Sequence, residues 1–250
     1  MTWGSPGLEM QAEYFAHLRE APSADVREGD GYVAVRTGAA SNTENGVVCS
    51  GADVPVDELV DRLRGAPASW LCTEDVHDDA LLVSALVAAG CRPETASWEM
   101  WASLDAIELP ARDVAVRVAE DEAGVAAWLD LAASNGWFDD PSERGPFERL
   151  YRELALRDDA RVVLYRAGED AFASAFYGDG TVLLTQLVVV ERARRRGIGT
   201  ELARVRLEEA RRRGCARAVL SPSREGLAFY QRLGFALART PPGRWFYLPC

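Results

Sequence analysis

The chain has 250 residues, of which 48% are hydrophobic and 27% charged, and its formal net charge at pH 7 is −11. This composition is typical of a globular protein with one large domain or two modest ones. No apolar run reaches the ~18 residues of a membrane-spanning helix, and the N-terminus lacks the basic and apolar regions of a secretory signal. We therefore expect a cytoplasmic protein without a membrane partner.

The charge is unevenly distributed. Residues 1–110 contain 19 acidic and 6 basic side chains, and every basic residue of the chain is an arginine. The acidic first half argues against a nucleic-acid partner. It is compatible with a cationic amine substrate, or with a role in solubility alone. The arginine-only usage, with many Ala and Gly, indicates a GC-rich and hence bacterial genome.

The five cysteines and two histidines show no spacing typical of a metal site, so we expect reduced thiols and no metal.

The first half predicts helices that alternate with strands. Asp78 is the expected N-cap of one helix, and Pro55 lies near the start of another. The predicted elements are a helix at 8–19, strands at 32–36 and 46–49, a helix after Pro55, a strand at 69–72, a helix at 79–89 and a strand at 97–104.

The second half repeats most of this order. Its predicted elements are a strand at 114–118, helices at 121–133 and 146–157, strands at 161–166, 171–177 and 181–190, a helix at 200–213, a strand at 216–220, a helix at 224–233 and a strand at 244–248. We therefore predict two related units, 1–108 and 109–250, joined by a linker at 105–113 that contains Pro110.

The stretch 181–213 carries the strongest chemical signal. A β-branched apolar strand leads into an arginine–glycine turn and then into an amphipathic helix that ends at Gly214. Such a turn directs unpaired backbone N–H groups and the positive end of the helix dipole at one point, which favours a phosphate group. The corresponding turn of the first unit, 50–55, contains Asp53 and Pro55 and should repel phosphate.

The turn reads R-x-x-G-x-G, from Arg194 to Gly199, and it follows the apolar run 187–189. This pattern resembles the acyl-CoA binding motif of the GNAT superfamily of N-acetyltransferases. The resemblance implies that the turn binds the pyrophosphate of CoA and that the strand edge binds the pantetheine arm and the thioester carbonyl. The residues expected to bind acetyl-CoA are Leu187, Val188, Val189, Arg194, Arg195, Arg196, Gly197, Ile198, Gly199 and Thr200.

A second segment, 219–235, resembles the final conserved segment of the same family, because Tyr230 and Leu233-Gly234-Phe235 are in place. Ser223 stands where the family usually has an Asn that contacts pantetheine, so we expect it to bind the cofactor. Tyr230 is the expected general acid that protonates the departing CoA thiolate, since a tyrosine of pKa ~10 can supply that proton.

The general base is not evident. Many family members carry a Glu on the central strand or on the strand before the tyrosine helix, but neither place has a carboxylate here. Asp139, Asp140 and Glu191 are nearby but are typical of solvated loops. We expect a base that acts through water, or an amine of low pKa. Gln186, Trp137 and Phe138 are expected to border the acceptor, the last two with core packing as the alternative.

Together these features predict an α/β protein in which a mixed, twisted GNAT sheet flanked by helices follows a degenerate GNAT-like unit without a CoA site. The expected activity is transfer of the acetyl group of acetyl-CoA to a primary amine of a small molecule in a ternary complex. Acetylation of a protein or peptide amine and a non-catalytic acyl-CoA sensor remain alternatives. The sequence leaves the oligomeric state open, with a homodimer as one alternative.

Overall fold

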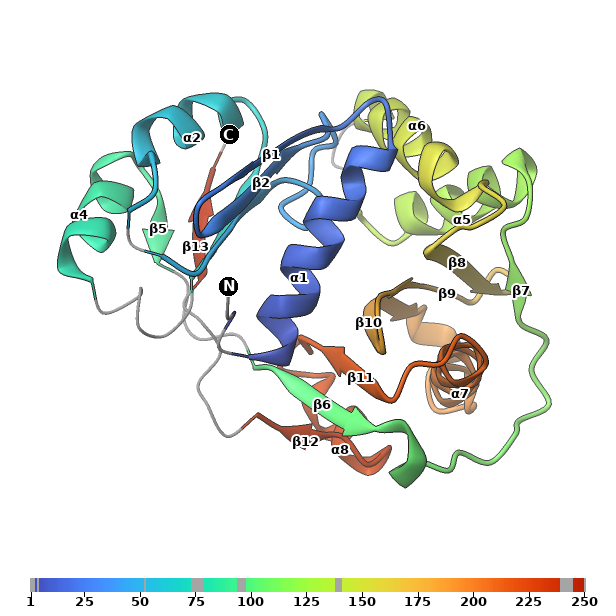
Figure 1. Ribbon diagram of the computed structural model, residues 1–250. Coiled ribbons are helices and arrows are strands. Elements are labelled where there is room, and N and C mark those ends of the chain that lie inside the picture. Colours follow the sequence, from blue (N-terminus) through green and yellow to red (C-terminus); the bar gives the residue numbers. More distant parts are fainter. Residues whose placement is uncertain are drawn as a thin grey trace.

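The computed structural model describes residues 3, 5–51, 53–72, 79–93, 98–137, 141–238 and 245–249. Within these ranges the chain forms two mixed β-sheets with helices on their faces, so the predicted α/β class is confirmed (Figure 1). None of the helices that the model describes is long and apolar enough to cross a membrane.

The first sheet has six strands. In spatial order they are β1 (Asp25–Gly29), β2 (Tyr32–Arg36), β3 (Gly46–Cys49), β4 (Ala68–Cys72), β13 (Trp245–Leu248) and β5 (Arg92–Pro93). Only β3 and β4 are parallel, and all other neighbours are antiparallel.

The second sheet has seven strands and the same pairing pattern around one parallel pair. In spatial order they are β12 (Ala236–Leu237), β6 (Met100–Ser103), β11 (Arg217–Leu220), β10 (Thr181–Val189), β9 (Ala171–Tyr177), β8 (Val162–Ala167) and β7 (Arg117–Val118). The parallel pair is β10 and β11. This correspondence agrees with the prediction of two related units.

The two halves of the chain exchange a strand. β6, from the first half, pairs with β11 and β12, whereas β13, from the C-terminal end, pairs with β4 and β5. Sheet membership therefore does not follow the predicted division at residue 108. Each predicted unit supplies an interior strand to the sheet of the other.

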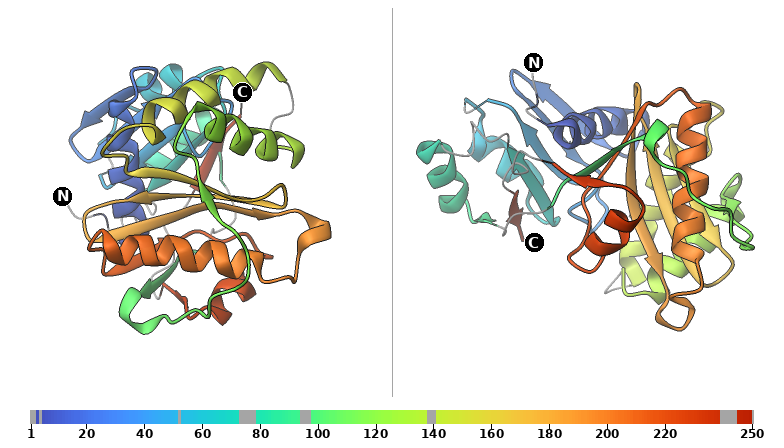
Figure 2. Two further views of the ribbon diagram at one scale, coloured as in Figure 1. Left: turned by 90° about the vertical axis from the view of Figure 1, so that its right-hand side faces the viewer. Right: turned by 90° about the horizontal axis from the view of Figure 1, so that it is seen from below.

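The helices lie in layers around the sheets (Figures 1 and 2). α1 (Pro6–His17) lies between the two sheets and shares a core with one face of each, together with α5 (Glu122–Ser134) and α6 (Arg144–Ala155). α2 (Val56–Leu63) and α4 (Ala80–Ala88) cover the outer face of the first sheet. α7 (Ile198–Arg212) and α8 (Leu227–Arg232) cover the outer face of the second sheet. The central core joins both halves, as its buried aromatic members Phe15, Trp128 and Phe172 illustrate.

Several details differ from the sequence-based expectations. β1 was not predicted, because its sequence Asp-Val-Arg-Glu-Gly is mostly polar, and none of its side chains is fully buried. The two-residue strands β5 and β12 are too short to give a period-2 pattern. The N-cap of α4 is Asp79, whose carboxylate accepts hydrogen bonds from the N–H groups of Leu81 and Leu82; Asp78, the predicted cap, lies outside the described residues.

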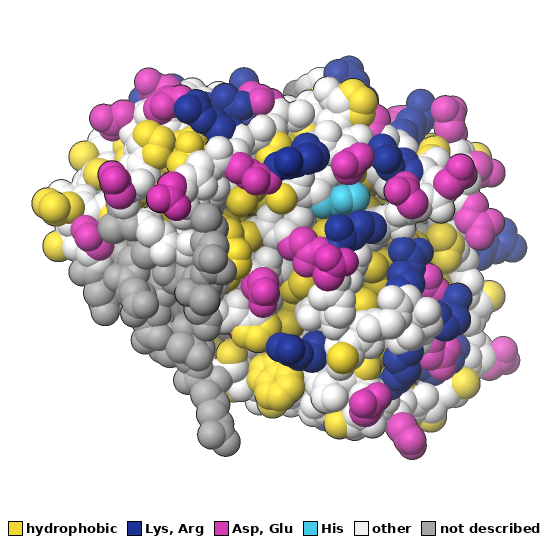
Figure 3. Space-filling view, viewed as in Figure 1, with side chains coloured by type: hydrophobic (Ala, Val, Ile, Leu, Met, Phe, Trp, Pro, Cys, Tyr) yellow, Lys and Arg dark blue, Asp and Glu magenta, His cyan; other side chains and the backbone are white. Residues whose placement is uncertain are grey.

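Charged side chains of both signs are interspersed over the face that carries α1 (Figure 3). Several are paired, such as Arg19 with Glu28 and Arg161 with Glu13. The first of these pairs is exposed and the second partly buried, and an exposed pair contributes little to stability by itself.

Candidate active site

The central parallel pair of the second sheet separates part of the way along its length. β10 pairs with β11 only from Thr181 to Leu183, opposite residues 217–219, although β10 continues to Val189. On its other edge β10 stays paired with β9 as far as Val189. The backbone of residues 184–189 therefore faces an opening in the sheet. In the first sheet, by contrast, β3 and β4 remain paired along all four residues of β3.

A β-bulge lies in β10 beside this opening. The pairing with β9 shifts between Thr185 and Val188, and Gln186 has a positive φ of 50°. Positive φ is uncommon for a residue other than glycine and marks local strain. The buried Arg206 of α7 stabilises this backbone, because its Nη1 donates to the carbonyls of Ser174 (3.0 Å) and Thr185 (3.1 Å).

The arginine–glycine turn adjoins the opening. After the 3₁₀ turn η4 (Glu191–Ala193), Arg195 has φ of 66° and Gly197 has φ of 83°, and Gly197 is the N-cap of α7. The first N–H group with a partner in the helix belongs to Glu201, which donates to the carbonyl of Gly197. The N–H groups of residues 198–200 therefore point out of the helix with its positive dipole, as an anion site requires.

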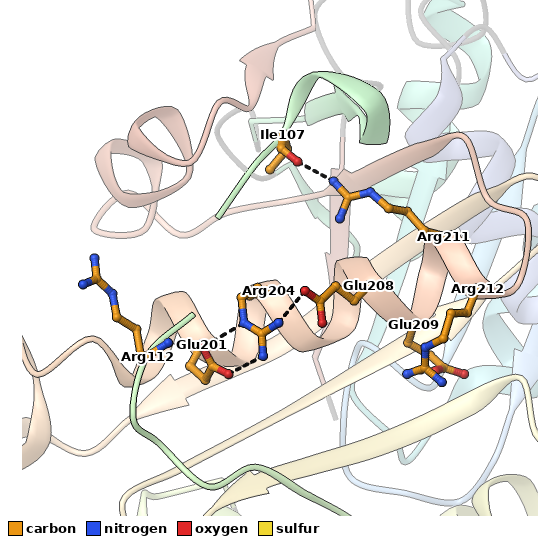
Figure 4. Close-up of polar contacts among 8 residues, drawn as sticks. All are labelled: Ile107, Arg112, Glu201, Arg204, Glu208, Glu209, Arg211 and Arg212. Carbon is orange, nitrogen blue, oxygen red and sulfur yellow. Dashed lines mark hydrogen bonds and ion pairs between the residues drawn. The ribbon is translucent and has the colours of Figure 1, made fainter. Parts of the chain in front are cut away.

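A buried carboxylate anchors this end of α7. Glu201, with 3% of its surface exposed, accepts two hydrogen bonds from the guanidinium of Arg204 and one from the N–H of Arg112 (Figure 4). The hydrogen bond to Arg204 is the main reason that the pKa of Glu201 is lowered. Arg204 also pairs with Glu208 one turn later. The chain before α5 is thereby attached to the turn.

The arginine side chains of the turn lie at the surface. Arg194, Arg195 and Arg196 are all exposed. Arg194 donates to the carbonyl of Val189 at 3.2 Å, and Arg196 lies 3.7 Å from Asp170. Neither Arg194 nor Arg195 has a carboxylate partner among the described residues. Both guanidinium groups are therefore available to a phosphate.

A cavity of about 1250 Å³ occupies the opening and extends between the two halves. Its walls include residues of α1, of the loop before β3 and of β4 from the first half. All predicted cofactor residues line it, and so do Gln186 and Tyr230. The predicted cofactor residues are Leu187, Val188, Val189, Arg194, Arg195, Arg196, Gly197, Ile198, Gly199, Thr200 and Ser223.

Tyr230 and Ser223 lie on the α8 side of the cavity. The Tyr230 ring packs against Phe229 and Phe235, with centroids 4.9 and 5.5 Å away. Its hydroxyl has no hydrogen-bond partner among the residues that the structure describes. The Ser223 hydroxyl oxygen accepts a hydrogen bond from the N–H of Gly226 at 3.1 Å. Ser223 therefore orders the start of α8, and its hydroxyl can still donate one hydrogen bond to a ligand and accept another.

Trp137 lies away from the cavity. Its ring packs in the central core against Trp128, Phe147 and Phe172, with centroid distances of 5.5 to 5.8 Å. The position corresponds to the core-packing alternative rather than to an acceptor wall. Phe138, Asp139 and Asp140 lie outside the described residues.

Three glutamates at the cavity were not recognised in the sequence; Glu108 and Glu225 are exposed, and only Glu44 is buried. β10 and β11 carry no acidic side chain that could act as a base, as expected, but Glu44 of the first half lines the cavity opposite them. Its Oε1 accepts hydrogen bonds from the Tyr151 hydroxyl (2.8 Å) and from Gln186 Nε2 (3.0 Å). No local motif marks Glu44, since 142 residues separate it from Gln186.

The described residues contain no group of three or more His, Cys, Asp or Glu side chains placed to bind a metal ion.

Comparison with known proteins identifies the class. Residues 123–235 match the model of the acetyltransferase (GNAT) family. No curated protein matches the chain in a sequence search. The chain therefore contains a GNAT acetyltransferase domain, as its motifs predicted.

Solved structures give the same fold over nearly the whole chain. A GCN5-related N-acetyltransferase from Kribbella flavida is 17% identical with a TM-score of 0.62, over 97% of this chain and 95% of that one. A protein of unknown function from Staphylococcus epidermidis is 12% identical with a TM-score of 0.61, over 91% and 93%. A tandem GNAT protein from the clavulanic acid biosynthesis pathway is 14% identical with a TM-score of 0.50, over 90% and 82%. Because identities this low carry only the fold, these structures support a tandem GNAT arrangement and not a substrate.

Proposed function

We propose that this protein is an N-acetyltransferase that moves the acetyl group of acetyl-CoA directly to a primary amine of a small molecule, in a ternary complex. The observation that carries the proposal is the separation of β10 from β11 after Leu183, next to the N-terminus of α7. The separated strand offers free backbone groups for an extended amide chain, and the helix end offers N–H groups for a diphosphate. Four described cysteines are free and buried, which suits the reducing cytoplasm of a bacterium.

In this proposal the N–H groups of residues 198–200 bind the pyrophosphate, with Arg194 and Arg195 at its rim. The pantetheine arm lies along residues 187–189, so the thioester is next to the bulge at Gln186. Tyr230 protonates the CoA thiolate as the C–S bond breaks. The first half contributes walls to the cavity but does not bind CoA, because β3 and β4 stay paired and its turn contains Pro55.

The two-sided cavity favours a small acceptor. Its walls come from both halves, and a volume of about 1250 Å³ exceeds the ~300–1,000 Å³ of an ordinary ligand pocket. That leaves space for an acceptor beside a pantetheine arm. A peptide substrate would instead need an open groove along the surface.

Calorimetric titration with acetyl-CoA, followed by mass spectrometry of a panel of primary amines incubated with acetyl-CoA and the protein, tests the proposal. We expect binding with one site per chain and a mass increase of one acetyl group on an amine. Absence of acetyl-CoA binding would refute the proposal. Binding without transfer to any amine would favour an acyl-CoA sensor.

A further inference from the structure

Glu44 is a fully buried carboxylate surrounded by neutral donors. Its exposed fraction is 0%, and its Oε1 accepts the hydrogen bonds from Tyr151 and Gln186. Its Oε2 accepts a hydrogen bond from the hydroxyl of Thr43. Within the described parts of the chain, no arginine or histidine lies within ion-pair distance of Glu44. Burying a carboxylate without a cation is costly, so such a group is an unusual feature of a cavity wall.

The surrounding loop holds Glu44 in place. The side chain of Asn45, also 0% exposed, accepts from the N–H and hydroxyl of Thr37 and donates to the carbonyls of Ala39 and Ser41. At Gly46 a Cβ atom would come within 2.0 Å of the carbonyl oxygen of Ser69, so only glycine fits there. Because the two residues that follow it in the chain are fixed, the position of Glu44 is set by the fold.

The groups around Glu44 are not alternative proton acceptors. Burial, and then the charge of Glu44, raises the pKa of Tyr151 and of Tyr14 well above the usual value. Both phenols therefore remain neutral near pH 7. The amide of Gln186 has no basic form. Glu44 is thus the one carboxylate of this cluster, beside two neutral phenols and an amide.

A ligand can replace one hydrogen-bond partner of Glu44, the Thr43 hydroxyl at Oε2. Oε1 is held by two buried partners, whereas the partner of Oε2, Thr43, is exposed and lines the cavity. A ligand cation could take the place of the Thr43 hydroxyl at Oε2 without disturbing Tyr151 or Gln186. Gln186, which touches Glu44, directly precedes the strand residues proposed to bind pantetheine, so the cation would arrive beside the thioester.

We infer that Glu44 is the anionic group of the acceptor site, and that it binds the ammonium form of a small primary amine and takes its proton. This inference rests on the proposed function. It assigns the base to the first half of the chain, in place of a carboxylate on β10 or β11.

The proton balance is complete. The ammonium loses one proton to Glu44 and becomes a neutral amine. In water at pH 7 only about 0.04% of a lysine-like amine is in this neutral form. The nitrogen then forms a bond to the thioester carbon, and the C–S bond breaks with its electron pair on sulfur. The nitrogen loses a second proton to solvent. Tyr230 gives a proton to the thiolate and regains one from solvent, while Glu44 releases its proton as product leaves. The net products are the amide, CoA thiol and one proton.

The test compares Glu44→Gln with a matched variant, Glu99→Gln. Glu99 is also a buried glutamate of the first half, 4% exposed, and accepts hydrogen bonds from Ser5 and from the N–H of Gly7, but it does not line the large cavity. Each full-length protein is loaded with CoA, and binding of benzylamine, a cation at pH 7, is compared with binding of the neutral benzyl alcohol by ligand-observed NMR. Acetyl-CoA binding is measured separately by calorimetry, because it tests the proposed function and not Glu44.

We expect the wild-type protein and Glu99→Gln to bind benzylamine at least about tenfold more tightly than benzyl alcohol, and Glu44→Gln to lose this preference. With benzylamine as acceptor, kcat/KM should fall about 100-fold or more in Glu44→Gln, in line with the loss of a general base. Acetyl-CoA affinity should stay unchanged in both variants. A wild-type preference near one, or a preference that Glu44→Gln retains, would overturn the inference.

If Glu44→Gln does not fold, Glu44→Asp replaces it, since aspartate keeps the carboxylate on a side chain that is one methylene shorter. Its preference for benzylamine should fall about tenfold, and an unchanged preference would overturn the inference equally. If the wild-type protein does not acetylate benzylamine, the binding comparison alone decides.

Discussion

Replacing Gly199 by Ala should weaken acetyl-CoA binding without harming the fold. A Cβ atom at Gly199 would lie 3.5 Å from Cζ of Phe229 and 3.7 Å from Cδ2 of Leu187, which is ordinary van der Waals contact. Gly199 is the second residue of α7, where alanine favours the helix over glycine by at most ~1 kcal/mol. The free energy of unfolding should therefore stay the same or rise by up to ~1 kcal/mol, a change of at most about 2–4 °C in Tm.

The same substitution should weaken acetyl-CoA binding although it does not destabilise the fold. The new methyl group would occupy the space between Phe229 and Leu187, where the proposed cofactor passes from the turn to the separated strand. Accommodating an extra methyl in a packed contact costs about 1–3 kcal/mol. At ~1.4 kcal/mol per tenfold change in affinity, the Kd for acetyl-CoA should rise about 5- to 150-fold.

Calorimetry with acetyl-CoA and thermal unfolding of the free protein measure both quantities. Gly145→Ala is the matched control, because Gly145 is also the second residue of its helix and a Cβ atom there meets nothing within 4 Å. That variant should show the same small change in Tm and no change in Kd. If Gly199→Ala binds acetyl-CoA like the wild type, the cofactor does not pass this point, and the proposed site is wrong.

Three further substitutions test the catalytic role of Tyr230, the ion pair of Glu201 and the placement of β13. Tyr230→Phe should lower kcat about 100-fold while the Kd for acetyl-CoA changes less than about threefold; equal losses would contradict a general-acid role. Glu201→Gln should reduce the free energy of unfolding at pH 7 by about 1–3 kcal/mol, because the hydrogen bonds of a buried carboxylate are lost. Since the pKa of Glu201 is lowered in the folded state, this contribution is present above the unfolded pKa of ~4.3 and is lost as the pH falls through the folded value. Denaturant unfolding at pH 7 and pH 3 should therefore show a smaller difference at pH 3, and a constant difference would argue against the ion pair. Phe246→Ala should cost about 3–5 kcal/mol in the same assay, because Phe246 is 1% exposed between β4 and β5, and a cost below ~1 kcal/mol would argue against the exchanged strand.

The fold class and the cofactor motif could be predicted from the sequence because both depend on residues that are close together in the chain. The strand–glycine turn–helix at 181–213 needs only neighbouring residues to express its geometry, and the positive φ at Gly197 is what a glycine there indicates. The structure places the residues of this motif on one cavity.

The role of Glu44 and the exchange of strands could not be predicted, because both depend on contacts between distant parts of the chain. The contact of Glu44 with Gln186 joins residues 142 positions apart, and it depends on how the first sheet faces β10 across α1. β6 and β13 have ordinary strand sequences, and nothing in an apolar–polar alternation says which sheet a strand will enter. Trp137 shows a related ambiguity, since an aromatic residue in a loop suits a ligand wall and a core equally well.

The place of β13 also bears on how the polypeptide matures in the cell. Because residues 245–248 complete the first sheet between β4 and β5, the facing edges of those two strands stay unpaired until residues 245–248 have been synthesised. Until then the first half of the chain has unpaired strand edges, a condition in which chaperones are commonly needed. Because each sheet contains a strand from the other half of the chain, the two sheets should unfold as one cooperative unit.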